Sequence, residues 1–331
     1  MPTTIRPINP QDLEECVSLG LEAFEPVHLS MERRYGKDLF DRLRPDWETA
    51  QAAQIRYLCS ADDKHSAVAV TNGTVSGFIV VTANEATGLA SINTIAVRPT
   101  EQRNGLGALL VEHSVIGLRR SGMAFAQAYL RDFPGHEPAR RLLEQAGFAS
   151  MPMQPMPLYL KLGDGGPATH SHESIRAITE ADVSDCVRFG LESFRPVYSS
   201  FKQQHGEQVY PRMFPNWEIT QAEYIESVCG STDHETFVYD LDGAVSGFVV
   251  LAMGDQLLGE IELLAVDPAK QGNGIGTALN QFAIDRLTGT GMAYAIVATA
   301  DDPGHAAARR SYAKVGFIPM PIQWNFMIAE L

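Results

Sequence analysis

The sequence predicts an α/β protein made of two tandem domains, each built on a mixed, mostly antiparallel sheet flanked by helices. Three observations predict this fold class: a duplication that spans nearly the whole chain, an alternation of strand-like and helix-like patterns within each copy, and strong hairpin turns at the same place in both copies. Each copy is about as long as one ordinary domain and far longer than a solenoid repeat. The duplication therefore indicates two domains rather than an array.

The two copies can be followed by eye. The matched segments are IRPINPQDLEECVSLGLEAFEPV (5–27) with IRAITEADVSDCVRFGLESFRPV (175–197), VSGFIV (75–80) with VSGFVV (245–250), and IAVRPTEQRNGLGALL (95–110) with LAVDPAKQGNGIGTAL (264–279). The polar, glycine-rich segment GDGGPATHSHES between the copies is typical of a linker. We expect an N-terminal domain over residues 1–162, a linker over 163–174 and a C-terminal domain over 175–331.

Within each copy the expected elements follow one order. In the first copy these are a strand at 5–8, a helix at 10–24, a long mixed stretch containing Trp47, a strand pair at 65–81, a strand and helix around the glycine loop, a strand at 123–130, a loop with Pro-Gly-His, and a short helix at 139–148. The strand pair turns at Asn72-Gly73, and its repeat turns at Asp242-Gly243. Both dipeptides are strong signals for a tight hairpin.

The glycine loop QGNGIG (271–276) follows a strand-like run and a breaker at Asp267-Pro268, and it precedes a helix-like run. Its spacing fits neither the GxGxxG of dinucleotide folds nor the loop of nucleoside-triphosphate-binding proteins. A strand, a glycine loop and a helix form an anion-binding geometry, because the free N–H groups of the first helical turn point outward and the helix dipole adds positive charge there. A tight turn that only packs the helix on the sheet is the alternative.

Composition limits the possible settings. With 45% hydrophobic residues the chain can form two cores, no apolar run approaches a membrane span, and the start MPTTIRPINP has no signal-peptide core, so we expect a soluble cytoplasmic protein that binds no membrane. The net charge is −14, mostly from the second half, and there is no basic stripe, so nucleic acid is not expected as a partner. The four cysteines are assigned to the cores, and no metal site is expected.

The downstream segments ARRLLEQAGF (139–148) and ARRSYAKVGF (308–317), together with the element order and the Q-x-N-G-x-G loop, resemble the GCN5-related N-acetyltransferases (GNAT), twice over. The resemblance implies acetyl-CoA, or another acyl-CoA, as the cofactor, with its pyrophosphate on the loop amides, its pantetheine along the preceding strand and its thioester in a splay between two strands. It also places a histidine of each Pro-Gly-His, His136 or His305, where the family often has a cofactor-binding asparagine. The implied cofactor contacts, besides His305, are Val266, Gln271, Gly272, Asn273, Gly274, Ile275, Gly276 and Thr277 in the second copy, and Val97, Gln102, Arg103, Asn104, Gly105, Leu106 and Gly107 in the first.

The copies differ in the groups that could move a proton. The resemblance implies a carboxylate base on the glycine-loop strand and a tyrosine acid on the last helix. The second copy offers Glu260 and Glu262, which lie two residues apart and so on one face of a strand, and Tyr312. The first copy has Ser91, Asn93 and Leu143 at these positions. We expect the C-terminal domain to catalyse direct attack in a ternary complex and the N-terminal domain to be degenerate.

The resemblance implies that the acceptor pocket is shaped by the segment between the first helix and the hairpin. Glu192, Phe194, Tyr198 and Trp217 are its candidate residues, although packing explains those that repeat in the first copy equally well. The expected acceptor is the amine of a small molecule, and the acidic second half favours a cationic one. Two alternatives stay open: a non-catalytic acyl-CoA-binding protein, and an acyltransferase of this fold with another donor such as an aminoacyl-tRNA. The sequence does not indicate an oligomeric state.

Overall fold

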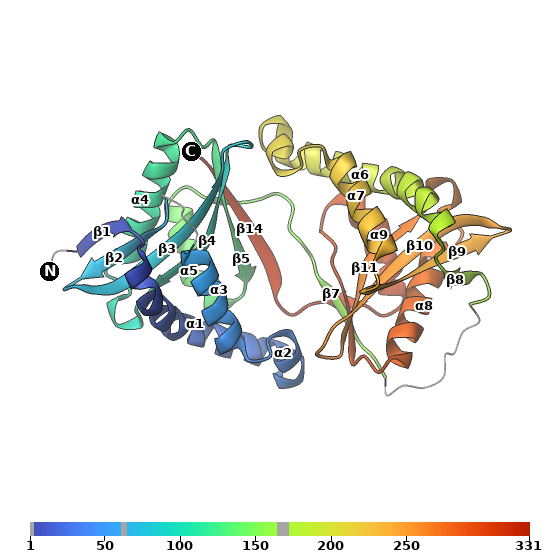
Figure 1. The fold of residues 1–331 in the computed structure, drawn as a ribbon, viewed down its shortest axis with the longest axis horizontal. Coiled ribbons are helices and arrows are strands. Elements are labelled where there is room, and N and C mark those ends of the chain that lie inside the picture. Colours follow the sequence, from blue (N-terminus) through green and yellow to red (C-terminus); the bar gives the residue numbers. More distant parts are fainter. Residues whose placement is uncertain (1–2, 61–64, 164–171) are drawn as a thin grey trace. The chain divides into compact units, whose positions relative to one another are not determined.

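The computed structural model describes residues 3–60, 65–163 and 172–331, which form two compact units (Figure 1). Unit 1 comprises Met1–Pro152 and Pro321–Leu331, and unit 2 comprises Met153–Met320. Each unit has one seven-stranded mixed sheet with helices on both faces. The predicted fold class is confirmed.

Unit 1 has the strand order β1-β2-β3-β4-β5-β14-β6, and all neighbouring strands are antiparallel except the parallel pair β4 and β5. Its strands are β1 (Thr3–Pro7), β2 (Ala67–Thr71), β3 (Thr74–Asn84), β4 (Leu89–Val97), β5 (Phe125–Asp132), β6 (Ala149–Ser150) and β14 (Gln323–Glu330). Its α-helices are α1 (Leu13–Tyr35), α2 (Lys37–Leu43), α3 (Trp47–Cys59), α4 (Leu106–Arg120) and α5 (Glu137–Gln145).

Unit 2 repeats this topology with the order β13-β7-β12-β11-β10-β9-β8, and β11 and β12 are its parallel pair. Its strands are β7 (Leu158–Lys161), β8 (Ile175–Ala177), β9 (His234–Leu241), β10 (Ala244–Met253), β11 (Leu258–Val266), β12 (Tyr294–Val297) and β13 (Ile318–Pro319). Its α-helices are α6 (Val183–Met213), α7 (Trp217–Gly230), α8 (Ile275–Gly289) and α9 (Ala306–Lys314).

The expected domain boundaries are wrong at two places, because the halves exchange a strand. β7 precedes the repeat boundary but pairs with β12 of unit 2, and β14 follows the second copy but pairs along its whole length with β5 of unit 1. Figure 1 shows the red β14 beside β5 and the green β7 among the orange strands of unit 2. Most of the expected linker, residues 164–171, lies outside the described residues.

The segments that lead into the exchanged strands explain why they do not fold back. Three prolines, Pro152, Pro155 and Pro157, precede β7, and Pro319 and Pro321 precede β14. Proline fixes its own φ, lacks an N–H and holds the preceding residue extended. Such a segment favours a straight connection over the tight turn that a local hairpin would need.

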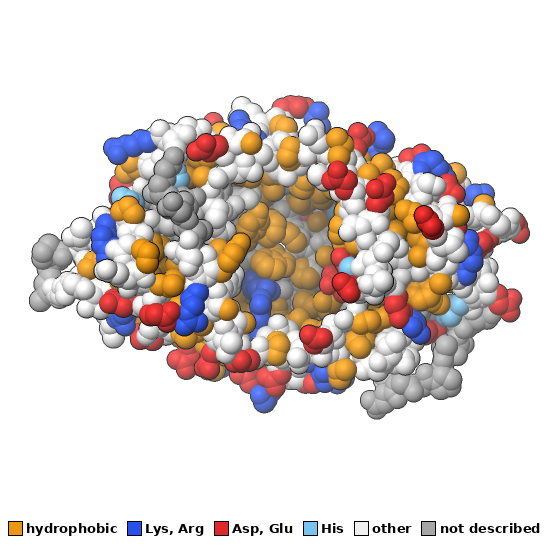
Figure 2. Space-filling view, in the orientation of Figure 1, with side chains coloured by type: hydrophobic (Ala, Val, Ile, Leu, Met, Phe, Trp, Pro, Cys, Tyr) orange, Lys and Arg blue, Asp and Glu red, His pale blue; other side chains and the backbone are white. Residues whose placement is uncertain are grey.

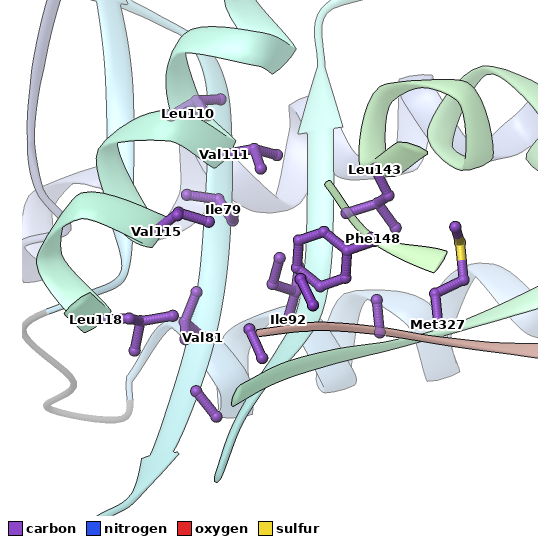
Figure 3. Close-up of a cluster of buried hydrophobic side chains, with 14 of the residues drawn as sticks. Ile79, Val81, Ile92, Leu110, Val111, Val115, Leu118, Leu143, Phe148 and Met327 are labelled. Atoms are coloured by element: carbon purple, nitrogen blue, oxygen red, sulfur yellow. The ribbon is translucent and has the colours of Figure 1, made fainter. Parts of the chain in front are cut away.

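Two cores lie on the two faces of each sheet. In unit 1, α4 and α5 cover one core and α1 and α3 cover the other. Met327 of β14 and Leu143 of α5 both belong to the first of these cores, with exposed fractions of 0% and 1%. Figure 3 shows Met327 among the side chains of this cluster. The exchanged strand therefore completes the core of unit 1.

Two features of β4 and β11, the strands that precede the glycine loops, shape the candidate site. β4 and β11 each contain a register shift against the neighbouring antiparallel strand, which leaves Asn93 and Glu262 as the extra residues of a bulge. The parallel pairing then stops at once, after Ile92 in unit 1 and Ile261 in unit 2. The adjacent strands separate beyond these residues, which is the splay that the resemblance implied.

Candidate functional site

The glycine loops of both units have the conformation of an anion-binding helix start. Gly105 and Gly274 are the N-caps of α4 and α8, with φ of 80° and 84°, in the left-handed region that favours glycine. Neither of these 15-residue helices has an acidic residue in its first turn. The free amides and the positive end of the dipole are therefore left unopposed for a bound anion.

The other loop residues differ in what they do. The side-chain amides of Gln102 and Gln271 donate to the carbonyl oxygens of Val97 and Val266 at 3.0 and 3.1 Å, so they fix the loop to the end of its strand. Arg103 adopts a φ of 65° where unit 2 has Gly272 at 83°. A left-handed arginine is strained, so unit 1 holds a cation at the loop at some cost in stability.

A pocket of about 680 Å³ opens at the glycine loop of unit 1. It is lined by Gln102, Arg103 and Gly105–Ala108 of the loop and the start of α4, by the separating parts of β4 and β5, by Phe24 and Val27 of α1, and by Pro134–His136. Asn93 and Leu143, the counterparts of Glu262 and Tyr312, both line it. Glu262 and Tyr312 occupy the equivalent positions of the second copy.

The structure brings Glu260 and Glu262 together on the α7 side of the unit 2 sheet. Glu262 accepts a hydrogen bond from the Tyr224 hydroxyl of α7 and lies 2.7 Å from Nε2 of His234 of β9. The described residues give Glu260 no hydrogen-bond partner. The predicted common face is confirmed, and Tyr224 and His234 are additional members of the cluster.

Glu260 and Glu262 differ in their electrostatic surroundings. Burial raises the pKa of Glu260, and the charge of Glu262 raises it further. Burial also raises the pKa of Tyr224, as does its hydrogen bond to Glu262, so Tyr224 stays a donor at neutral pH. A carboxylate with a raised pKa and no partner is suited to accept a proton, whereas Glu262 is held in place by its neighbours.

Unit 1 has no titratable pair at this position in the part of the chain that the structure describes. Ser91 accepts a hydrogen bond from Gln127 at 2.9 Å, and Asn93 donates to Thr82 at 3.1 Å. None of these groups changes its protonation state near neutral pH.

Tyr312 lies on the opposite face of the unit 2 sheet from the carboxylates. It is 6% exposed and belongs to the core under α8 and α9, together with Ile261 and Val297, where β11 and β12 begin to separate. Burial raises its pKa, so the hydroxyl keeps its proton, and no described residue hydrogen-bonds to it. The hydroxyl of Tyr312 therefore lies protonated within this core.

The histidines of the two Pro-Gly-His segments have different partners at Nδ1. Nδ1 of His136 accepts from the backbone N–H of Arg131 at 2.9 Å, and burial, with the charges of Arg131 and His28, lowers its pKa to about 4. Neutral His136 therefore has its proton on Nε2. In unit 2, Nδ1 of His305 pairs instead with the carboxylate of Asp302, which fixes the orientation of the ring.

Asp302 is a buried residue of this site that the sequence did not reveal. Burial alone would raise its pKa, but His305 and the hydrogen bonds from Ser200 and Gly304 outweigh burial, so its pKa lies below the usual range. Unit 1 has Phe133 at this position. Comparison of the two copies at this position is the signal that could have found it.

The expected acceptor residues have mixed surroundings. Tyr198 stacks on Trp217 at 4.0 Å and its hydroxyl donates to Gln221 at 3.0 Å, while unit 1 repeats the stack with His28 and Trp47 at the same distance. Phe194 packs against the core under α6, and Glu192 is exposed. The stacked pair is thus a repeated packing unit.

Acidic and basic side chains are interspersed over the visible described surface, without a continuous basic stripe (Figure 2). Within residues 3–60, 65–163 and 172–331, no helix is long and apolar enough to cross a membrane. The same residues contain no group of three or more His, Cys, Asp or Glu side chains placed to hold a metal ion.

Comparisons with known proteins give one family model and two curated relatives. The family model described as Acetyltransferase (GNAT) family matches residues 32–148 and 194–317. Among curated proteins, a mycothiol acetyltransferase of Mycolicibacterium gilvum is 37% identical over 47% of this chain and 62% of that protein. One of Beutenbergia cavernae is 35% identical over 27% of this chain and 29% of that protein. The matches thus span less than two thirds of these relatives.

A solved structure has a similar fold along nearly the whole chain. The tandem GNAT protein from the clavulanic acid biosynthesis pathway matches with a TM-score of 0.56 and 16% identity, over 99% of this chain and 98% of that chain. At this identity the match shows the fold alone.

Proposed function

Because this chain belongs to the acetyltransferase (GNAT) family, whose donor is acetyl-CoA, we propose that it acetylates the amine of a small molecule and that unit 2 carries out the transfer. One observation carries this proposal: Glu260 and Glu262 lie together at the splay behind a glycine loop, whereas unit 1 has Ser91 and Asn93 there.

The residues present fit acetyl-CoA. In unit 1 the pocket of about 680 Å³ joins the glycine loop to the splay, and in unit 2 the loop has the same left-handed N-cap glycine. The amides from Gly272 to Thr277 would hold the pyrophosphate, and Val266 would border the pantetheine. When bound, acetyl-CoA supplies the thioester carbonyl that the amine attacks.

Glu260 is the proposed general base. An amine must lose its proton to attack, and a base is most effective when its pKa approaches the working pH. The raised pKa of Glu260 moves it in this direction, and Glu262, held by Tyr224 and His234, maintains the negative charge that raises it. The same two charges favour a cationic amine over an anionic one, since they attract the ammonium form.

Tyr312 is the proposed general acid. Its pKa is raised, it has no hydrogen-bond partner among the described residues, and it belongs to the core that contains Ile261 and Val297, the last paired residues of β11 and β12. It can therefore donate its proton to the leaving thiolate as the amine attacks directly in a ternary complex. His305, fixed by Asp302 through Nδ1, would offer Nε2 for a hydrogen bond with the bound cofactor.

Unit 1 is proposed to bind the cofactor without turning it over. Its pocket, the strained Arg103 at the loop and the Nε2–H donor of His136 support binding, whereas Ser91, Asn93 and Leu143 supply no group that exchanges a proton near neutral pH. The alternative of a non-catalytic acyl-CoA-binding protein is thus proposed for unit 1 alone and not for the whole chain.

Kinetics test the assignment of roles. The full chain is assayed with acetyl-CoA over a panel of small amines, including mycothiol-related ones because two relatives are named for mycothiol. Glu260→Gln and Tyr312→Phe should each lower kcat by roughly 10²- to 10⁴-fold, while Ser91→Ala, the matched change in unit 1, should leave it unchanged. Equal rates for Glu260→Gln and the unaltered chain would contradict the choice of base.

Calorimetric titration with CoA tests the two binding roles. We expect two sites per chain, and one site after either Gly105→Val or Gly274→Val, because a β-branched residue does not adopt the left-handed φ of these positions. Acetyl transfer should be lost only with Gly274→Val. Loss of transfer with Gly105→Val alone would reverse the proposed roles of the units.

A further inference from the structure

Arg131, at the end of β5 in unit 1, is a guanidinium without an acidic partner. It is partly buried, its central carbon lies 4.2 Å from the ring centroid of Trp324, and its Nη1 donates to the Tyr35 hydroxyl at 3.4 Å. The described residues accept no other side-chain hydrogen bond from it. Of its five N–H donors, most are therefore left without a protein acceptor.

The surroundings of Arg131 add positive charge rather than neutralise it. Burial lowers the pKa of Arg131, opposed by Tyr35 and reinforced by Arg44, and the pKa of His28 falls to about 4 through burial and the charges of Arg44 and Arg131. His136, which accepts from the Arg131 amide, is also neutral at pH 7. Two cations thus face two uncharged histidines, with no carboxylate among the groups that shift their pKa values.

Unit 2 has different residues at the positions that correspond to this cluster. The counterparts of Arg131, Tyr35, Arg44 and Trp324 in unit 2 are Ala300, His205, Phe214 and Pro155. Strand pairing confirms one of these equivalences, because Trp324 lies opposite Arg131 and Pro155 opposite Ala300. In unit 2 this region is an aromatic cluster, in which Phe201 stacks on Phe214 at 5.1 Å. The fold therefore does not need a cation there.

The position adjoins the cofactor pocket. Leu130 and His136 line the pocket, Arg131 follows Leu130 along β5, and its amide donates to His136. Val27 lines the pocket and also packs beside Phe133 and Trp47 in a cluster next to this cation. A ligand at Arg131 would thus lie beside Leu130 and His136, which line the pocket.

We propose that unit 1 has a second binding site, at Arg131, Tyr35 and Trp324, for a small organic carboxylate with an aromatic or apolar body. Arg131 would donate to the carboxylate, the Tyr35 hydroxyl would donate its own hydrogen, and Trp324 would pack against the body. Arginine suits this partner because its planar fork of donors matches the two oxygens of a carboxylate. The site is independent of the proposed chemistry in unit 2.

Saturation-transfer NMR on the full chain tests this, with benzoate as the probe, benzamide as its neutral analogue and phenyl phosphate as the other anion. Benzoate should bind saturably, and benzamide at least about tenfold more weakly, because a charge-assisted hydrogen bond is replaced. Arg131→Met should weaken benzoate by a similar factor. Arg119→Met, which removes an exposed arginine elsewhere in unit 1, should not. Tyr35→Phe is a milder second variant and should weaken benzoate about threefold or more.

Three results of these binding measurements would contradict the proposal. Equal benzoate affinity in Arg131→Met and the unaltered chain, or equal affinity for benzamide and benzoate, would overturn the site, and tighter binding of phenyl phosphate would overturn the choice of a carboxylate. The thermal midpoint of unliganded Arg131→Met gives an independent measure. It should equal or exceed that of the unaltered chain, because an unneutralised cation is removed, and a clear drop would mean that Arg131 serves packing instead.

Discussion

Met327→Ala should destabilise unit 1, although Met327 lies in the second half of the sequence. Its side chain is 0% exposed within the core under α4 and α5. Truncating a buried methionine to alanine costs about 2–5 kcal/mol. For a unit of this size each kcal/mol lowers the melting midpoint by about 2–4 °C, so the expected drop is roughly 4–20 °C. Leu158→Ala in β7, at 4% exposed, should in turn destabilise unit 2.

Tryptophan fluorescence separates the units, because Trp47 and Trp324 lie in unit 1 and Trp217 in unit 2. Trp217→Phe leaves a signal from unit 1, and Trp47→Phe with Trp324→Phe leaves one from unit 2. Met327→Ala should lower the midpoint of the first signal and Leu158→Ala that of the second. The exposed Glu330→Ala should change neither by more than about 0.5 kcal/mol. A Met327→Ala effect confined to the Trp217 signal would refute the exchange of strands.

Three further outcomes are expected. In the pH profile of kcat/KM, the midpoint of the fall at acid pH should lie above the ordinary glutamate pKa of about 4.3, because the base form is lost as pH falls through the raised pKa of Glu260. Glu262→Gln should move this midpoint toward lower pH, because it removes the charge that helps to raise the pKa of Glu260. Asp302→Asn should destabilise unit 2 by about 1–3 kcal/mol at pH 7 in chemical denaturation. Because the folded pKa of Asp302 is lowered, this stability is present above its unfolded value of about 3.9 and is lost as pH falls through the folded pKa, so the difference should shrink in acid. Arg103→Gly should stabilise unit 1 by up to about 1 kcal/mol, because it relieves a left-handed φ. It should also weaken CoA binding to unit 1 in the calorimetric titration, and an unchanged affinity would show that Arg103 does not contribute to that binding.

Local chemistry made much of the fold predictable. The Asn72-Gly73 and Asp242-Gly243 turns have positive φ at both residues, as the dipeptides require, and Gly105 and Gly274 begin their helices in the left-handed region. These features depend on a few adjacent residues. A sequence pattern therefore specifies them directly.

The exchanged strands were not predictable in this way. Leu158 and Met327 occupy equivalent positions in the two copies, so the pattern is satisfied whichever sheet receives each strand. The choice depends on long-range pairing and on the stiffness of the preceding proline segments. Comparing the two copies therefore does not show which sheet receives which strand.

The candidate site was predictable in part. The i, i+2 spacing placed Glu260 and Glu262 on one face, but the bulge that sets Glu262 beside the splay depends on the register of β10. Tyr224 and Asp302 were missed, although unit 1 has Gln54 and Phe133 in their places. Positions where only one copy has a titratable group were the useful signal.

The exchange of β7 and β14 fixes an order of events during synthesis. β14 emerges from the ribosome only after all of unit 2, so β5 of unit 1 must wait with an unpaired edge while more than 160 further residues are made. Unit 2, in contrast, has β7 at hand before its own helices appear. The half of the protein that begins first is therefore the half that finishes last, and an unfinished chain would expose the edge that borders the cofactor pocket.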